Sequence, residues 1–361
     1  MTTNSNTTKM EIRRKTRYLA LFLWMLAAVF VTVTSCSFYA LYKTRDVLDA
    51  SGYTETWAEG VDGETLEGIV YGEKEWNKLD VFFPAELAPE KSRGAIVYIH
   101  GGAWSGGSRA DMRAFARRMT KAGYVSASVG YMLYKEGVTD SFYSIFTILD
   151  EIDAALVQLK KTASERGIEL DRVALGGDSA GGHILSLYAY SRGKSAPLPV
   201  AFIAPRVAPI DFHADAWSPV LSPDLVGRLV QEMNHVGPIS GEQIKSPDES
   251  TEELINAVSP LAFVTLDAAV PTVAAYGRKD PLVGAKHCAK LTKRFEELDA
   301  KSLLDVAPDD EETIVFDCVE FPHSRHLLER DPDCAARFHE LVLKYAERYL
   351  DVKTNNEQSS L

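Results

Sequence analysis

The sequence predicts an α/β fold in which helices cover both faces of a mostly parallel sheet. Short runs of β-forming residues alternate with helical patterns through most of the chain, which is typical of this class. Several of the runs, among them Ala95–Ile99 and Thr272–Tyr276, are apolar almost throughout, as expected for strands that are covered on both faces. With 361 residues, of which 46% are hydrophobic and 25% charged, the chain can bury a sizeable core.

Eight strands are expected, and they are separated by turn-forming residues. The first two alternate more strongly between apolar and polar residues than the others, so we expect them to form an antiparallel edge of the sheet. The expected strands are Leu66–Tyr71, Leu79–Phe83, Ala95–Ile99, Tyr124–Val129, Arg172–Leu175, Val200–Ile203, Thr272–Tyr276 and Thr313–Val319.

Five helices are expected from apolar residues at helical spacing. Residues 209–270 carry no strand signal, and a connection of this length in a compact domain is usually functional. We interpret it as a lid or a pocket wall, with a surface loop as the alternative. The expected helices are Ala110–Ala122, Ser144–Arg166, Ala180–Ser191, Gly284–Leu298 and Asp333–Tyr349.

The N-terminal part of the chain reads as a membrane anchor. Residues 18–42 carry no charge and are numerous enough to span a bilayer as a helix. The basic residues within 1–17 precede this segment, which predicts a cytoplasmic N-terminus and an extracytoplasmic catalytic domain. A lipoprotein modified at Cys36 and a protein secreted after signal cleavage are the alternatives. We expect residues 43–60 to be a linker, 61–351 the folded domain and 352–361 a polar tail.

Charge and cysteine content exclude several classes of function. The net charge is −12, and we expect no Lys/Arg cluster in the body of the chain. The basic run at Arg13 to Arg17 flanks the apolar segment, so a nucleic-acid partner is not expected. The four cysteines form no CxxC pair and no zinc-like spacing with histidine. A disulfide remains open, but the sequence does not name the pair. No metal or organic cofactor is indicated.

A nucleophile motif follows the fifth strand. Gly177-Asp178-Ser179-Ala180-Gly181 matches G-x-S-x-G, and it lies between an apolar strand and a helical run. This strand–turn–helix setting is what a nucleophile elbow requires, because the sharp turn lifts the serine hydroxyl above the sheet. We therefore predict that Ser179 is the nucleophile. His183, one turn into the helix, is interpreted as a packing or supporting residue.

A glycine-rich loop follows the third strand. In His100-Gly101-Gly102-Ala103-Trp104 the glycines allow backbone N–H groups to face a substrate oxygen, and one such donor is worth about 10²–10³ in rate. His100 and Gly101 are expected to support the loop. Trp104 is expected either to line the acyl pocket or to cap the core.

The HGGAW and GGDSAGGH motifs resemble bacterial esterases and lipases of the hormone-sensitive-lipase-like and feruloyl-esterase-like branches of the α/β-hydrolase fold. The resemblance covers about residues 66–351 and includes the strand KLDVFFP at 78–84. It implies that the backbone N–H groups of Gly102, Ala103 and Ala180 form the oxyanion hole. Ala103 replaces a usual glycine, and Met132 replaces an arginine that commonly follows the next strand.

Chain order in this fold is serine, acid, histidine. Asp280 follows an apolar strand in the G-x-x-D-x-x-V pattern that the resemblance implies for the acid, and Asp211 is the second candidate. His326 stands four residues after Pro322, as the resemblance implies for the base, and His323 is the second candidate.

The sequence thus predicts a serine hydrolase that cleaves a small carboxylic ester, with Ser179, Asp280 and His326 as its triad. An amidase or peptidase that uses the same triad is one alternative, and a catalytically inactive binding module is another. The oligomeric state is not indicated.

Overall fold

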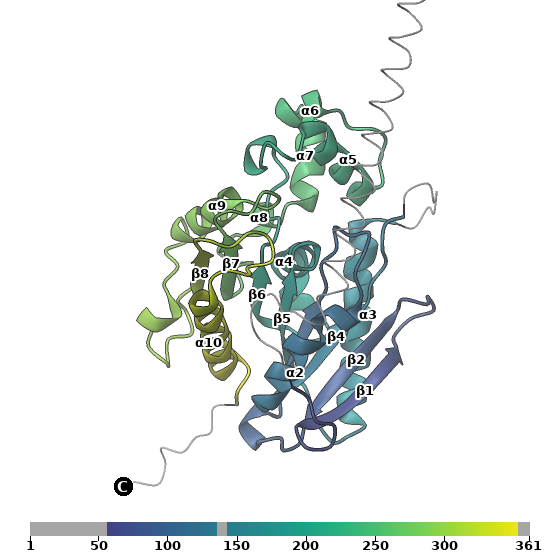
Figure 1. Ribbon diagram of the computed structural model, residues 1–361, viewed down its shortest axis with the longest axis vertical. Helices are drawn as coiled ribbons and strands as arrows, with labels where there is room; N and C mark the ends of the chain where they lie inside the picture. Colours follow the sequence, from purple (N-terminus) through teal and green to yellow (C-terminus); the bar gives the residue numbers. More distant parts are fainter. Residues whose placement is uncertain (1–55, 136–142, 353–361) are drawn as a thin grey trace, which may run out of the picture. The chain divides into compact units, whose positions relative to one another are not determined.

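The computed structural model describes residues 56–135 and 143–352 (Figure 1). Its centre is an eight-stranded sheet in the order β1-β2-β4-β3-β5-β6-β7-β8. All eight expected strands are present, with ends that differ by up to three residues. They are β1 Gly63–Val70, β2 Lys78–Pro84, β3 Gly94–Ile99, β4 Val125–Val129, β5 Arg172–Asp178, β6 Val200–Arg206, β7 Thr272–Gly277 and β8 Phe316–Phe321.

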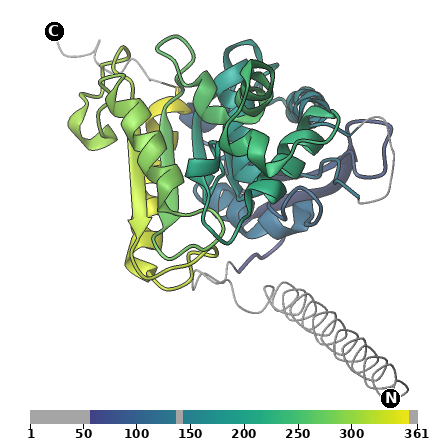
Figure 2. The ribbon, with the colours of Figure 1, turned by 90° about the horizontal axis from the view of Figure 1, so that it is seen from above.

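The sheet is parallel except at one edge. Strand β2 pairs antiparallel with both β1 and β4, whereas β4, β3, β5, β6, β7 and β8 pair in parallel. The expected antiparallel edge is therefore confirmed. Seen from above in Figure 2, the yellow strand β8 and the purple strand β1 lie toward opposite sides of the view.

Helices cover both faces of the sheet, as predicted. Alternate residues of β3 show the division, since Val97 and Ile99 pack in one apolar core and Ile96 and Tyr98 in the other. Helices α3, α4 and α9 cover the first face, and α2 and α10 cover the second. These five helices are α2 Arg113–Lys121, α3 Ile145–Ser164, α4 Ala180–Arg192, α9 Ala285–Glu296 and α10 Pro332–Tyr349.

The connection between β6 and β7 contains four helices that the sequence analysis did not predict. It carries no strand of the sheet, in agreement with the expectation for residues 209–270, but it is not a surface loop. The helices are α5 Pro223–Asn234, α6 Gly241–Lys245, α7 Glu249–Val258 and α8 Pro260–Phe263, and α5 to α7 lie together at the top of Figure 1.

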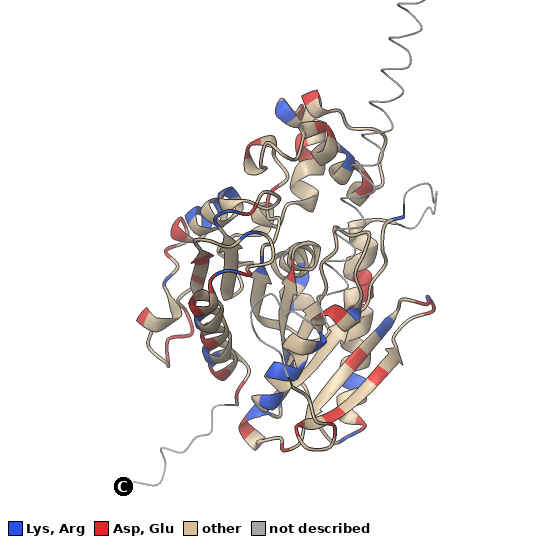
Figure 3. Cartoon of the chain, viewed as in Figure 1, with Lys and Arg blue, Asp and Glu red and all other residues tan. Residues whose placement is uncertain are grey.

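Helix α2 carries a second basic cluster, so the expectation of none in the body of the chain is wrong. It appears in blue in Figure 3. Arg113 forms ion pairs with Glu67 and with the buried carboxylate of Asp80, and Lys121 lies 3.5 Å from Asp62. These acidic partners neutralise part of the cluster within the protein, so it gives no support to a nucleic-acid site.

The predicted anchor at 18–42 lies outside the described residues, as do most of the linker and the polar tail. Within the ranges 56–135 and 143–352, no helix combines the length and the apolar character needed to cross a bilayer.

Candidate active site

Ser179 lies in the sharp turn between β5 and α4. Its backbone has φ 52° and ψ −117°, a conformation that residues other than glycine rarely adopt. Two backbone hydrogen bonds hold the turn, because the Ser179 N–H donates to the Arg206 carbonyl and the His183 N–H donates to the Ser179 carbonyl, both at 2.9 Å. A strained residue held in this way is typical of functional sites.

Two glycines let the elbow approach the neighbouring strand. A Cβ at Gly177 would lie 2.4 Å from the Ile99 carbonyl oxygen, and a Cβ at Gly181 would lie 2.1 Å from the same atom. Neither distance is compatible with a side chain. The small residues on both sides of Ser179 are therefore required by the packing of β5 and α4 against the end of β3.

Ser179, His326 and Asp280 form a continuous hydrogen-bonded line. His326 Nε2 lies 2.9 Å from Ser179 Oγ, and His326 Nδ1 lies 2.7 Å from Asp280 Oδ2. An ionised carboxylate only accepts hydrogen bonds, so Nδ1 carries the ring proton and Nε2 is left to accept the serine hydroxyl. The arrangement can take a proton from Ser179 and stabilise the imidazolium that results.

Asp280 is held rigidly by its own loop. Its side chain is fully buried, and its second oxygen accepts the backbone N–H groups of Leu282 at 2.8 Å and Val283 at 3.1 Å. Both carboxylate oxygens are thus occupied, one by the loop and one by the imidazole. The side chain of His326 remains 20% exposed, so a small molecule can reach it.

Asp211 and His323, the second candidates for the acid and the base, lie outside this line of contacts. Asp211, after β6, bonds to His213 and Lys290. His323 bonds to Asp331 at 2.7 Å and exposes 68% of its side chain. Among the described contacts, neither joins the line from Ser179 to Asp280.

The loop after β3 brings backbone donors to the same end of the sheet. Ala103 and Trp104 both have positive φ, 50° and 58°, so this turn is strained as well. Among the described residues, the N–H groups of Gly102, Ala103 and Ala180 donate no hydrogen bond. Ala180 is the first residue of α4, where a helix leaves N–H groups unpaired. These three groups are chemically suited to bind an oxyanion.

His100 supports this loop. Its ring stacks on Tyr131 with centroids 4.2 Å apart, its Nδ1 lies 2.8 Å from the Gly101 carbonyl oxygen, and its own carbonyl accepts the Tyr131 hydroxyl at 2.8 Å. Burial lowers the pKa of His100 to about 4, so the ring is neutral at pH 7. The replacement of the usual arginine by Met132 is visible in the sequence, whereas this contact of the adjacent Tyr131 was not predicted.

Trp104 and His183 form a second support. The Trp104 indole N–H donates to His183 Nδ1 at 3.1 Å, and His183 Nε2–H donates to the Val258 carbonyl at 2.8 Å. His183 is fully buried, and burial lowers its pKa to about 4. One neutral imidazole thus connects the glycine-rich loop, the helix after Ser179 and the end of α7. Sequence spacing gave no signal for this contact across 79 residues.

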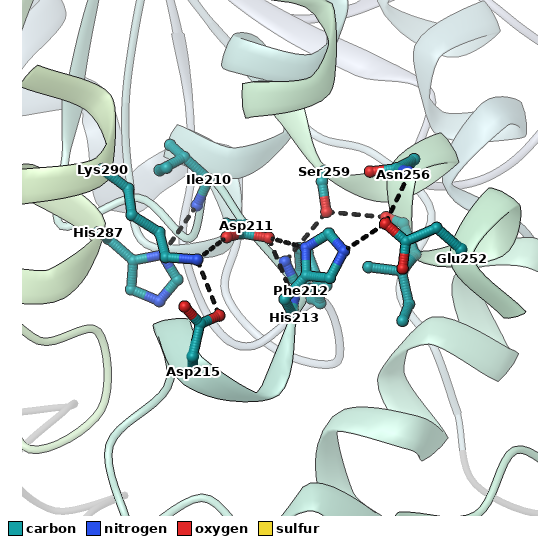
Figure 4. A network of polar contacts seen from close by, with 11 residues as sticks. Ile210, Asp211, Phe212, His213, Asp215, Glu252, Asn256, Ser259, His287 and Lys290 are labelled. Carbon is teal, nitrogen blue, oxygen red and sulfur yellow. Dashed lines mark hydrogen bonds and ion pairs between the residues drawn. The ribbon is translucent and has the colours of Figure 1, made fainter. Parts of the chain in front are cut away.

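A charged network ties the β6–β7 connection to α9 (Figure 4). Lys290 bonds to Asp211 and Asp215, and His213 bonds to Asp211 at 2.6 Å and to Glu252 at 2.9 Å. The hydrogen bond to Asp211 raises the pKa of His213 to about 9. Burial alone would raise the pKa of Asp211, but hydrogen bonds from His213 and Lys290 hold it well below its usual value.

Comparison with known families gives one match that covers most of the domain. The model of the BD-FAE family matches residues 79–295, which include Ser179, Asp280 and the glycine-rich loop. His326 lies beyond the matched range.

Several curated proteins are similar over part of the chain. Esterase LipQ of Mycobacterium tuberculosis is 23% identical over 57% of this chain and 47% of its own length. Kynurenine formamidase of Danio rerio is 25% identical over 56% of this chain and 57% of its own. A probable isoprenylcysteine α-carbonyl methylesterase of Oryza sativa is 26% identical over 34% of this chain and 27% of its own. The chain thus spans less than two thirds of each of these relatives.

Solved structures of esterases share the fold. Esterase B from Lactobacillus rhamnosis has a TM-score of 0.60 at 18% identity, with 87% of this chain and 93% of that chain covered. An esterase from Thermogutta terrifontis has a TM-score of 0.55 at 17% identity, with 82% and 96% covered. At these identities the likeness shows the α/β-hydrolase fold.

Proposed function

The chain belongs to the BD-FAE family of α/β-hydrolase esterases, and from that premise we propose that it is a serine carboxylic-ester hydrolase working through an acyl-enzyme. The observation that carries this proposal is the line of contacts from Ser179 Oγ through the His326 ring to the Asp280 carboxylate.

In the proposed reaction, Ser179 Oγ attacks the ester carbonyl while His326 Nε2 takes the hydroxyl proton. His326 then returns that proton to the departing alcohol, and the acyl group remains on Ser179. Water attacks the acyl-enzyme in the second half, again with His326 as base. Asp280 keeps the imidazole in the productive tautomer and stabilises its charged form.

The tetrahedral intermediate carries a negative charge on the former carbonyl oxygen. The backbone N–H groups of Gly102, Ala103 and Ala180 are proposed to bind it. Their positions in two strained turns support this role, because fixed donors do not need to reorganise when the charge develops. His100, Gly101 and Trp104 are proposed to support the loop and not to take part in proton transfer.

Hydrolysis of p-nitrophenyl acetate by three variants tests the proposal. We expect Ser179→Ala and His326→Ala each to lower kcat by about 10⁴ or more. His323→Ala is the matched control, since it removes a histidine three residues away that contacts Asp331, and it is expected to keep kcat near that of the wild type. A Ser179→Ala protein as active as the wild type would refute the assignment.

An amide hydrolase is the second candidate, favoured by the similarity to a kynurenine formamidase. The same triad can cleave amides, since only the leaving group differs. Pairs of an ester and an anilide that share the same acyl group distinguish the two functions. We expect a higher kcat/KM for the ester, and a preference for the anilide or for N-formyl compounds would select the second candidate.

We propose short-chain acyl esters as substrates, with residues 209–270 as a pocket wall over the site. This role is supported by contacts that join the connection to the site region. His183 Nε2–H donates to the Val258 carbonyl at 2.8 Å, and the rings of His183 and Phe212 pack with their centroids 5.1 Å apart. A series of p-nitrophenyl esters from acetate to palmitate is expected to peak at the short end. A maximum at long chains would favour a lipase.

We further propose, from the sequence, that residues 18–42 anchor the protein with its catalytic domain outside the cytoplasm. Fractionation of cells expressing the full chain, followed by protease treatment of spheroplasts, tests this. The domain should remain with the membrane and be cleaved from outside. Release into the medium would favour signal cleavage, and labelling by a lipid precursor lost in Cys36→Ser would favour a lipoprotein.

A further inference from the structure

Two cysteines far apart in the sequence meet on one face of the sheet. Cys288 lies in the first turns of α9 and is 3% exposed, and Cys318 lies in β8 beside Ala274 of β7 and is partly exposed. Their Sγ atoms are 2.7 Å apart. Two unbonded sulfur atoms do not pack this closely, and the separation exceeds a disulfide bond of about 2.05 Å by only about 0.7 Å.

No other described thiol competes for this pairing. Cys334, in α10, packs with the core on the opposite face of the sheet from Cys288 and Cys318. The sheet therefore lies between it and the pair. If one bond forms among the described cysteines, the fold selects its partners.

We propose that Cys288 and Cys318 form a disulfide that fastens α9 to β8. The oxidant is a disulfide of a small thiol or of a thiol oxidoreductase, and Cys318 reacts first because it is the more exposed of the two. Its thiolate attacks the donor disulfide, giving a mixed disulfide and one released thiol. The Cys288 thiolate then attacks Cys318 Sγ and expels the second thiol. The protein loses two electrons, the donor gains them, and both thiol protons leave with the released thiols.

The local chemistry suits this second step. Cys288 Sγ already lies 2.7 Å from Cys318 Sγ, the atom that it must attack, so the internal step needs little movement of either side chain. The bond would also join two elements next to the site. Helix α9 begins five residues after Asp280, and β8 ends five residues before His326. The link would thus hold together the segments that carry the proposed acid and base.

Peptide mapping of the full-length protein tests the bond directly. The protein is equilibrated with oxidised glutathione, denatured with excess iodoacetamide and digested without reductant. We expect a linked pair of peptides containing Cys288 and Cys318, with Cys334 alkylated. Alkylation of both Cys288 and Cys318 after this treatment, or a link that involves Cys334, would overturn the proposal.

Thermal unfolding gives an independent measurement. A disulfide that closes a loop of this length is expected to raise Tm by about 5–10 °C. We therefore expect dithiothreitol to lower the Tm of the oxidised protein by that amount, and to leave the Tm of Cys288→Ser and Cys318→Ser unchanged. Cys334→Ser is the matched control and should keep the sensitivity to reductant. If that sensitivity persists in Cys288→Ser, the bond is not the one proposed.

Discussion

The residues of the proposed triad come from three separate turns that meet at one edge of the sheet. Ser179 follows β5, Asp280 follows β7 and His326 follows β8. Backbone contacts fix Ser179, whose N–H donates to the Arg206 carbonyl, and Asp280, where two N–H groups hold one carboxylate oxygen. The other oxygen then has a defined direction, toward His326 Nδ1. The proposed reactivity of Ser179 depends on the orientation of His326 that Asp280 fixes in this way.

Replacing Asp280 by Asn keeps the size of the side chain but removes the carboxylate that orients His326. The amide has nearly the same size, but its NH₂ group cannot accept the Nδ1 proton and can favour the wrong tautomer of His326. We expect kcat for p-nitrophenyl acetate to fall by about 10³–10⁴ with little change in KM. Steady-state kinetics at pH 8 measure this.

Asp211→Asn is the control for that experiment. It changes the other candidate acid, which contacts His213 and Lys290 and not His326. Its kcat is expected to stay within about threefold of the wild type. A loss in Asp211→Asn as large as in Asp280→Asn would contradict the assignment of the acid.

Among the residues of the site, the sequence identified the nucleophile clearly but distinguished poorly between the two candidate bases. Ser179 stood out because its motif fell between a strand and a helix. His326 and His323 are three residues apart after the same strand, so position along the chain barely distinguishes them. Only the path of the loop does, since it directs His323 outward to Asp331 and His326 inward to Ser179. Local sequence carries little information about that path.

The hydrogen bond between His183 of α4 and Trp104 of the glycine-rich loop predicts that His183 positions the proposed oxyanion donors. His183→Ala leaves the indole N–H and the Val258 carbonyl without their partner, so the strained turn at Ala103 and Trp104 loses a support. We expect kcat to fall by about 10²-fold with little change in KM, because the oxyanion donors would be displaced. Trp104→Phe should act similarly, and the double variant should lose little more than either single one.

His287→Ala is the matched control for His183→Ala. His287 is also fully buried, but its Nδ1 accepts the Ile210 N–H and does not contact the glycine-rich loop. Both variants should lower Tm, whereas only His183→Ala should lower kcat of the folded protein. Equal kcat in the two variants would mean that His183 only packs.

The network in Figure 4 predicts how stability depends on pH. The pKa of His213 is raised to about 9 from an unfolded value near 6.5, so its stabilising contribution is complete below about pH 6.5 and is lost as the pH rises through 9. We expect this contribution to be on the order of 1–2 kcal/mol, since the side chain is 29% exposed and solvent screens the pairs.

Urea denaturation of the wild type and of His213→Gln at pH 6 and pH 9.5 measures this contribution. The two proteins should differ at pH 6 and converge at pH 9.5. His235→Asn changes a histidine at the exposed end of α5 and is the control. Its difference in unfolding free energy from the wild type should be the same at both pH values. A difference between wild type and His213→Gln that grows with pH would contradict the sign.

At the scale of elements, the central strands of the sheet were the easiest to predict. Their apolar runs are buried on both faces, so the pattern in the sequence reflects the structure directly. Helices α5 to α8 were missed, although α5 has 12 residues and is as long as the predicted helix α9. Their start signals were nevertheless present, with Ser222 before Pro223, the capping box of Ser240 and Gln243, and Asp248 before α7.

For the whole molecule, the order of the strands was not predicted. It depends on contacts between distant segments, such as the placement of β3 between β4 and β5. The order nevertheless determines the site, because β3 and β5 as neighbours bring the loop after His100 beside the elbow at Ser179. The close approach of Gly181 to the Ile99 carbonyl oxygen is a direct result of that placement.

The central claim is that the fold activates one hydroxyl, that of Ser179, and covalent labelling tests it most directly. The full-length protein is treated with an alkyl fluorophosphonate, digested and mapped by mass spectrometry. We predict one adduct on Ser179, no adduct in Ser179→Ala, and labelling of His326→Ala that is slower by at least about 10³-fold while His323→Ala labels at the wild-type rate. An adduct on another residue, or a folded wild-type protein that takes up no label, would contradict the account.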